Sequence, residues 1–321
     1  MFALIVLFLL NVVAWIVTII LYTQYNPSLL SLALICWTFG LRHALDADHI
    51  VAIDNVTRQL VNIDLNSNLV GFFFSIGHCL VVCIVNLIAI CTLAQLDFSE
   101  AQFYGGFIGT GVSAVFLLLI SVFSFYSCYK LHRNNPGESA SPQIGFLSKI
   151  LSPLFKLIDR PWKMIILGFL FGLGFDTATE IILVTISASS ILNNDPIWLT
   201  IMFPILFSLG MIFVDTLNGT VLLHVYTWKG LQHHQRQLFN FAITLFSGLM
   251  AFFISIIQFI SFFIQAFDAD IPGMEAIQDH FEWIGGAITI SFLLAWVCTF
   301  LIHRYQNPKL QTIDKDEAVD V

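Results

Sequence analysis

Long apolar stretches separated by short polar segments dominate the chain. An α-helix needs about 20 mainly apolar residues to cross the hydrocarbon core of a bilayer, and eight stretches reach that length. The expected transmembrane helices cover approximately residues 2–22, 28–53, 67–92, 104–130, 163–190, 197–225, 238–264 and 283–303. The pattern therefore predicts an all-α polytopic membrane protein with eight transmembrane helices.

The composition supports this fold class. Hydrophobic residues make up 58% of the 321 residues and charged residues only 11%, which lies outside the range of soluble domains. The first apolar stretch has no basic lead and no small-residue cleavage site, so we expect a retained helix and not a signal peptide. The formal net charge of −8 gives no reason to expect a nucleic-acid partner, and membrane lipid is the expected surrounding.

Polar segments divide the chain into two halves. The longest, 131–162, is predicted to be a cytoplasmic loop between an N-terminal half, 1–130, and a C-terminal half, 163–303, followed by a cytoplasmic tail, 304–321. Apart from Arg42, every basic residue, including Arg58, falls on the side of the even-numbered loops and the C-terminus. Because cytoplasmic loops retain Lys and Arg, we expect both termini to be cytoplasmic in a cell-membrane protein. The opposite loops are acidic.

Short sequence matches relate the two halves. FGL occurs at 39–41 and again at 171–173, while FSIG at 74–77 corresponds to FSLG at 207–210. The offsets are 132 and 133 residues, so the pairs stay in register. The helices that carry FGL would enter the membrane from opposite sides, which predicts two inverted-topology halves. Inverted repeats that meet at a midplane site are a transporter architecture.

The second expected helix carries a costly run of ionisable residues, LRHALDADHI, with Arg42, His43, Asp46, Asp48 and His49. Each Arg or Asp at a helix centre costs about 3 kcal/mol on insertion scales. Such a group suggests a divalent cation, a proton relay or a buried catalytic centre. On a continuous helix Asp48 points away from His43, whereas a helix broken near Asp46 would turn Asp48 into the same cavity.

Three other helices add polar residues at similar depth. They are His78, Asp176, Thr179, Glu180, Asp215 and Asn218. The carboxylates outnumber the one positive charge of Arg42. At low dielectric they cannot all stay ionised without bound cations, so some must bind a metal ion or take up protons. Imidazoles together with carboxylates suit a first-row ion such as Ni²⁺, Co²⁺, Zn²⁺ or Fe²⁺ better than Ca²⁺ or Mg²⁺, which prefer oxygen. We expect Arg42 to pair with an acid and to touch no cation.

Four motifs together resemble a known family. RHALDADHI, FSIGHCLVV, GLGFDTATE and GMIFVDTLNG resemble, in order, the signatures of the NiCoT family of nickel/cobalt permeases, and the likeness covers the whole eight-helix plan. The resemblance implies transport of Ni²⁺ and Co²⁺ across the cytoplasmic membrane, with His43, Asp48 and His49 central to recognition and His78 influencing selectivity.

The chain departs from this family pattern at two positions. Cys79 stands where Ser is expected, and Asn218 stands where a second Asp is expected. The first departure would soften the site, and the second removes a charge.

The metal ligands expected from sequence are His43, Asp46, Asp48, His49 and His78, supported by Arg42, Asp176, Thr179, Glu180, Asp215 and Asn218. The ion is expected as transported substrate, with no permanently bound cofactor, and a cytoplasmic metallochaperone stays an open question. An exporter of similar architecture would carry the same residues, although its long loop would often be rich in His. An intramembrane metalloenzyme with Glu180 as base is a third alternative, but HEXXH and GXSXG signatures are absent.

Overall fold

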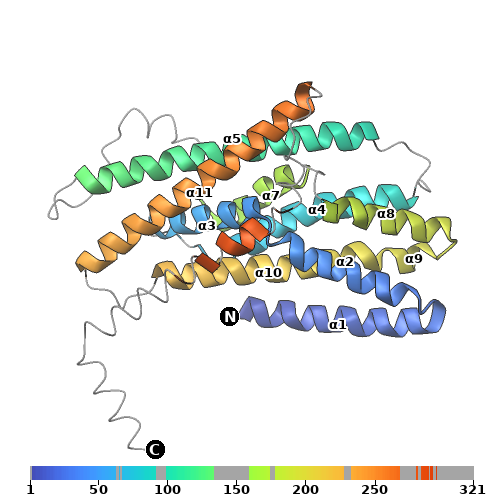
Figure 1. Ribbon diagram of the computed structural model, residues 1–321. Coiled ribbons are helices and arrows are strands. Elements are labelled where there is room, and N and C mark those ends of the chain that lie inside the picture. The colour runs from blue at the N-terminus through green and yellow to red at the C-terminus, as the bar shows by residue number, and fades with distance from the viewer. Residues whose placement is uncertain are drawn as a thin grey trace, which may run out of the picture.

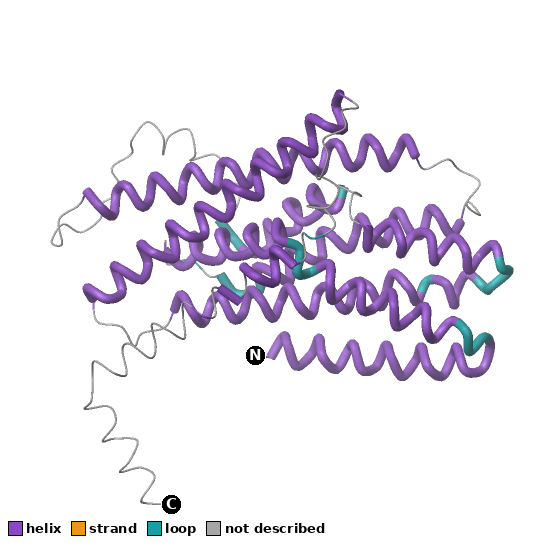
Figure 2. Tube along the Cα trace, viewed as in Figure 1, coloured by secondary structure: helices purple, strands orange, loops and turns teal. Residues whose placement is uncertain are grey.

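The computed structural model describes residues 2–62, 65, 67–91, 99–133, 159–173, 178–227, 233–267, 280, 283–288, 290–291 and 294. Across these residues the regular structure is helical, without a strand, as the tube view in Figure 2 shows. The all-α prediction is therefore confirmed for the part of the chain that is described.

Five uninterrupted stretches are long and apolar enough to cross a membrane, and they match the expected first, third, fourth, sixth and seventh helices. They lie in α1 (Phe2–Tyr25), α4 (Val70–Cys91), α5 (Ser99–Arg133), α9 with α10 (Ile197–Thr200 and Met202–Thr227) and α11 (His233–Phe267).

The second expected helix is broken. It consists of α2 (Leu29–His43) and α3 (Ala47–Asn62). The axis bends by 48° between them, and together they form a sixth candidate span. At the break the amide of Asp46 donates to the carbonyl of His43 at 3.0 Å, and the Asp46 carbonyl then accepts the Ile50 amide at 3.1 Å to begin α3. The bend therefore falls inside the charged run, where polar side chains are brought to the interior.

The fifth expected helix is also divided among shorter elements. After a 3₁₀ turn, η1 (Pro161–Lys163), come α7 (Met164–Gly172) and α8 (Ala178–Leu192), with residues 174–177 between them outside the described part. Most of the expected eighth helix, most of the 131–162 loop and all of the 304–321 tail also lie outside it. The count of eight spans consequently stays a prediction.

Helices α4 and α10 form the centre of the bundle. Helix α4 packs against α7 and α10, helix α10 also packs against α2 and α3, and α5 pairs with α11 on one side (Figure 1). Glycine allows two of these close crossings, because a Cβ at Gly40 would collide with the carbonyl oxygen of Phe207, and one at Gly168 with that of Phe74. The backbones of α2 and α10, and those of α7 and α4, therefore lie in close contact.

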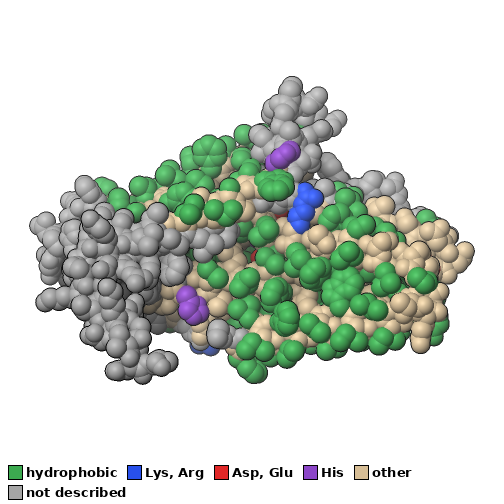
Figure 3. Space-filling model, turned by 60° about the horizontal axis from the view of Figure 1, so that its bottom comes forward, with side chains coloured by type: hydrophobic (Ala, Val, Ile, Leu, Met, Phe, Trp, Pro, Cys, Tyr) green, Lys and Arg blue, Asp and Glu red, His purple; other side chains and the backbone are tan. Residues whose placement is uncertain are grey.

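Apolar side chains cover much of the outer surface. Helix α1 exposes Phe2, Phe8 and Ile16, and α11 exposes Phe253, whose side chain is 66% exposed. Green hydrophobic side chains spread over the face in Figure 3 with few charges among them. Such a surface suits lipid contact, and the polar residues gathered inside need another explanation.

Candidate metal centre

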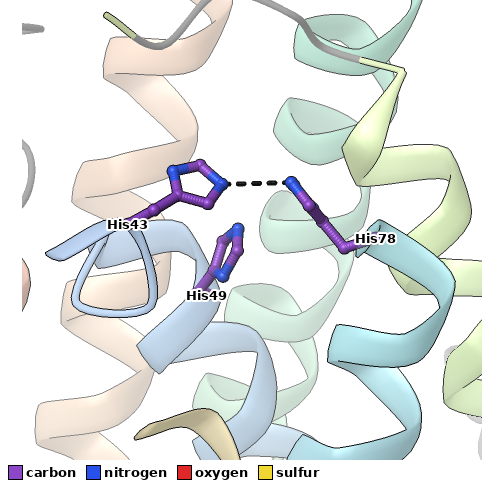
Figure 4. Close-up of side chains that lie close together, drawn as sticks. All are labelled: His43, His49 and His78. Carbon is purple, nitrogen blue, oxygen red and sulfur yellow. Dashed lines mark hydrogen bonds between the residues drawn. The ribbon is translucent and has the colours of Figure 1, made fainter. Parts of the chain in front are cut away.

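Three histidines from three helices meet inside the bundle. His43 ends α2, His49 lies in the first turn of α3, and His78 lies in the middle of α4. One ring nitrogen from each can be chosen so that all three lie within 4.8 Å of one another, and Figure 4 shows the rings converging. Each residue is at most 2% exposed. The break between α2 and α3 makes this possible, because it lets His43 and His49 approach His78 from different directions.

The closest pair of imidazoles has the spacing of two ligands on one ion. The Nε2 atoms of His43 and His78 are 3.0 Å apart. Two nitrogens bound at about 2.1 Å and at right angles to each other would lie about 3.0 Å apart. The centroid of the His49 ring lies 4.8 Å from those of both other rings, on the side of the pair nearest Phe74.

Carboxylates contact the same two imidazoles. Oε1 of Glu180 lies 2.8 Å from Nε2 of His78 and 3.6 Å from Nε2 of His43, and Glu180 is fully buried. Oδ2 of Asp46 lies 2.8 Å from Nδ1 of His43. When Nδ1 carries the proton it donates to Asp46, so the carboxylate orients the ring and leaves Nε2 as a lone-pair donor.

On α10, the buried Asp215 lies beside His49. Its Oδ2 is 3.6 Å from Nδ1 of His49 and accepts a hydrogen bond from the Ser75 hydroxyl at 2.6 Å. Its Oδ1 has no hydrogen-bond partner among the described residues, and neither do the Nδ1 atoms of His49 and His78. Buried polar atoms normally have partners, so each of these three atoms can still accept one.

The remaining expected residues occupy different positions. The Thr179 hydroxyl is 3.3 Å from Nδ1 of His43, whereas Asn218, 9% exposed, lies almost one turn beyond Asp215. Asp48 accepts the His49 amide at 2.9 Å and approaches the Gln258 amide on α11 at 3.5 Å, so these two contacts direct it toward the α3 backbone and α11. The side chain of Arg42 is exposed, and Asp176 lies outside the described residues.

The sulfur of Cys79 contacts helix α10. It lies 3.5 Å from the sulfur of Met211 and 3.8 Å from the carbonyl oxygen of Ser208, both on α10. The softening of the site that we expected from this departure finds no support in these contacts.

A second buried polar group was missed by the sequence reasoning. Asp54 and Arg58 continue α3 beyond His49 and are 0% and 6% exposed. Arg58 was assigned to a cytoplasmic loop, and that placement is wrong, because α3 continues to Asn62 after the break. The signal was present in the sequence: the residues after DHI keep polar groups at helical spacing, as Asp54 and Arg58 are four apart.

The chemistry of the first group suits a transition-metal ion. Three imidazoles and a buried carboxylate offer nitrogen and oxygen donors without a thiolate, and the surrounding rings of Phe74 and Phe207 exclude water. Ca²⁺ and Mg²⁺ would find too few oxygens, whereas Ni²⁺, Co²⁺ and Zn²⁺ accept such ligands.

Known proteins point to the same chemistry. The hydrogenase nickel incorporation protein HupN of Bradyrhizobium diazoefficiens is 34% identical over 312 residues, which cover 92% of this chain and 81% of the relative. A high-affinity nickel transport protein of Cupriavidus necator is 33% identical over 324 residues, covering 96% and 92%. The cobalt transport protein NhlF of Rhodococcus rhodochrous is 28% identical over 321 residues, covering 91% and 90%.

No solved structure gives a significant match to the chain. The family NicO, described as high-affinity nickel-transport protein, matches residues 29–302. These residues include all three histidines of the centre and the helices α8 and α10, which carry Glu180 and Asp215. The chain therefore belongs to this nickel-transport family.

Proposed function

We propose that the protein is a permease that takes up Ni²⁺, Co²⁺ or both across the cytoplasmic membrane through the three-histidine centre. The observation that carries the proposal is the convergence of His43, His49 and His78 in the interior, with ligand atoms within 4.8 Å. The similarity to nickel and cobalt transport proteins supports the choice of ion.

In this proposal the two close Nε2 atoms and a nitrogen of His49 replace part of the hydration shell of the ion. Glu180 supplies a fourth ligand, since its oxygen already lies 2.8 Å from one of these nitrogens. Asp46 and Thr179 orient His43, and Asp215 compensates the charge of the ion beside His49. Asp48 holds the start of α3 and thereby the position of His49. Binding must stay moderate, because the ion has to leave again.

We further propose eight helices in two inverted halves that rock about the centre, with both termini cytoplasmic. Reciprocal packing supports this architecture: Gly40 of the first FGL contacts Phe207 of FSLG, and Phe74 of FSIG contacts Gly168, one turn before the second FGL. The FGL helix of each half is also divided into shorter segments. A motion that separates the halves would open the centre to one side at a time.

A polar cavity of about 440 Å³ is the proposed entrance. It lies between the start of α2 and the end of α8, and Asp195 lines it. The carboxylate of Asp195 accepts hydrogen bonds from Asn26 at 2.9 Å and from Ser190 at 2.8 Å. A single carboxylate among amides and hydroxyls can attract a hydrated cation without binding it tightly.

The test is accumulation of ⁶³Ni²⁺ and ⁵⁷Co²⁺ in cells that express the wild type, His43→Ala or Asp48→Ala, with Zn²⁺ and Mn²⁺ as competitors. We expect both substitutions to abolish uptake while the protein still inserts in the membrane. His224→Ala is the matched control, because His224 is exposed on α10 and bonds only within its own helix. Undiminished uptake by both variants would refute the site, and reduced cellular nickel on expression of the wild type would indicate an exporter.

A further inference from the structure

A second polar cluster spans four helices below the metal centre. We call it the Arg58 network. Its members are all buried side chains that hydrogen-bond to one another, namely Asp54, Asn55, Arg58, Ser124, Tyr226 and Ser247. They come from α3, α5, α10 and α11, so the network joins both halves of the chain.

The guanidinium of Arg58 occupies an oxygen-lined position. Its Nη2 donates to Oδ1 of Asn55 at 2.6 Å, to the Ser124 hydroxyl at 3.0 Å and, more weakly, to the Ser247 hydroxyl at 3.4 Å. Amide and hydroxyl oxygens in this arrangement are what a hard cation would also bind. Arg58 therefore sits in the interior as a cation tethered to α3.

The carboxylate of Asp54 ties the neighbouring helices to this charge. Tyr226 of α10 donates a short hydrogen bond to its Oδ1, and Ser247 of α11 donates another to its Oδ2. Because Ser247 also accepts from Arg58, its hydroxyl bridges the two charges. Separation of α3 from α10 and α11 would break these bonds together.

The network lies further along α3 than the metal centre. Arg58 follows His49 by nine residues on the same helix, which at 1.5 Å per residue is about 13 Å further along α3. The polar cavity lies at the opposite end, beside the start of α2 and the end of α8. The metal centre thus lies between the end that holds the cavity and the end that holds the Arg58 network, in which Arg58 is the one cation.

We propose that the Arg58 network is the closed gate of the permease, in which Arg58 acts as a tethered cation that blocks passage of mobile cations and Asp54 acts as the latch that holds α3 against α10 and α11. This inference rests on the proposed transport function. A fixed positive charge in a narrow passage repels cations, and other channels exclude protons and cations in this way. The gate opens when α3 moves away from α10 and α11 and water reaches the charges.

The incomplete hydrogen bonding of Arg58 favours a gate that opens over a permanent link between the helices. Nε of Arg58 is buried without a hydrogen-bond partner among the described residues, and one of the Nη2 bonds is long. The guanidinium is therefore held by fewer bonds than it can form, so an open arrangement with water could compensate the loss. The helices that the latch joins are also those that carry His49 and Asp215.

The test uses the purified full chain in two measurements. Equilibrium binding of Ni²⁺ in detergent reports the metal centre, and valinomycin-driven proton entry into proteoliposomes without Ni²⁺ reports the gate. We compare Arg58→Gln, which removes the charge, with Arg58→Lys, which keeps it. Tyr226→Phe and Ser247→Ala weaken the latch without removing a charge and serve if Arg58→Gln does not fold. Ser121→Ala is the control, because Ser121 is a buried serine that bonds only within α5.

For Arg58→Gln we expect proton entry to rise about tenfold or more while the Kd for Ni²⁺ stays within about threefold of the wild type. Proton entry should be slower for Arg58→Lys than for Arg58→Gln. Tyr226→Phe and Ser247→Ala should raise proton entry by less than Arg58→Gln does, and Ser121→Ala should match the wild type. Proton entry at the wild-type rate in all network variants would refute the proposed gate. A tenfold weaker Kd for Ni²⁺ in Arg58→Gln would also refute it, because it would assign Arg58 to the binding site. Absence of Ni²⁺ binding by the wild type would instead refute the proposed function.

Discussion

The three-histidine centre and the Arg58 network are both buried polar clusters on helix α3, yet they differ in how their atoms are paired. At the centre, Nδ1 of His49, Nδ1 of His78 and Oδ1 of Asp215 have no hydrogen-bond partner among the described residues. In the network, both carboxylate oxygens of Asp54 are bonded to hydroxyls and the guanidinium has three acceptors.

This difference separates a place for a guest from a bond between helices. Two imidazole nitrogens 3.0 Å apart and several unpaired atoms leave the centre short of partners, which a bound ion can supply to the nitrogens it meets. Hydrogen-bonded charges instead stabilise one arrangement of the helices and resist the loss of a partner. The same helix can therefore carry a binding site at its start and a barrier nearer its end.

Removal of the guanidinium should have the largest effect on stability. Arg58→Leu leaves Asp54 as a buried charge without its cation, which should lower the free energy of unfolding by roughly 3–5 kcal/mol. His49→Ala, at an equally buried position, should lower it far less, because Nδ1 of His49 has no hydrogen-bond partner among the described residues. Thermal unfolding of both variants in the same detergent measures the difference. Equal losses in the two variants would contradict the contrast.

Bound nickel should stabilise the protein through the centre. At a free Ni²⁺ concentration 100 times Kd, the folded state should gain about 2.7 kcal/mol, and the gain should vanish on chelation. At the same free Ni²⁺ concentration His78→Ala should lose most of this response because it binds more weakly, while His224→Ala should keep it, since His224 is exposed and bonds within its own helix. A full response in His78→Ala would exclude that imidazole from the site.

Substitution of the carboxylate beside His49 should weaken binding by less. Asp215→Asn keeps the shape and the acceptor for Ser75 but removes the charge, so the affinity for Ni²⁺ should fall about 10- to 100-fold. Asp195→Asn, at the polar cavity, should leave the affinity in detergent unchanged and slow uptake in cells. Isothermal titration and ⁶³Ni²⁺ uptake separate the two. The proposed roles would be reversed if only Asp195→Asn weakened binding.

Cys79→Ser should have the smallest effect. The sulfur of Cys79 contacts Met211 and the carbonyl oxygen of Ser208, both on α10. The Kd for Ni²⁺ and the preference over Co²⁺ should change less than about threefold, or about 0.7 kcal/mol. A larger shift in a competition titration would show that the sulfur reaches the ion.

The sequence predicted most of the helices correctly because hydrocarbon thickness constrains apolar length, and five of the eight expected stretches correspond to uninterrupted apolar spans. It also brought attention to His43, His49 and His78, since imidazoles at membrane depth are costly. The break near Asp46 was only an alternative, because periodicity cannot choose between a straight helix and a bent one. The network could not be predicted because basic residues outside apolar stretches indicate loops, and Arg58 follows such a stretch. The partners of Arg58 also come from segments up to 189 residues away.

X-ray absorption at the nickel edge of the purified, Ni²⁺-loaded protein tests the account most directly, since the outer-shell scattering of imidazole rings reveals how many histidines bind. We predict three imidazoles with additional oxygen ligands in the wild type, two in His78→Ala, and three again in His224→Ala. A shell of oxygen atoms without imidazole scattering, unchanged between the wild type and His78→Ala, would contradict the three-histidine centre.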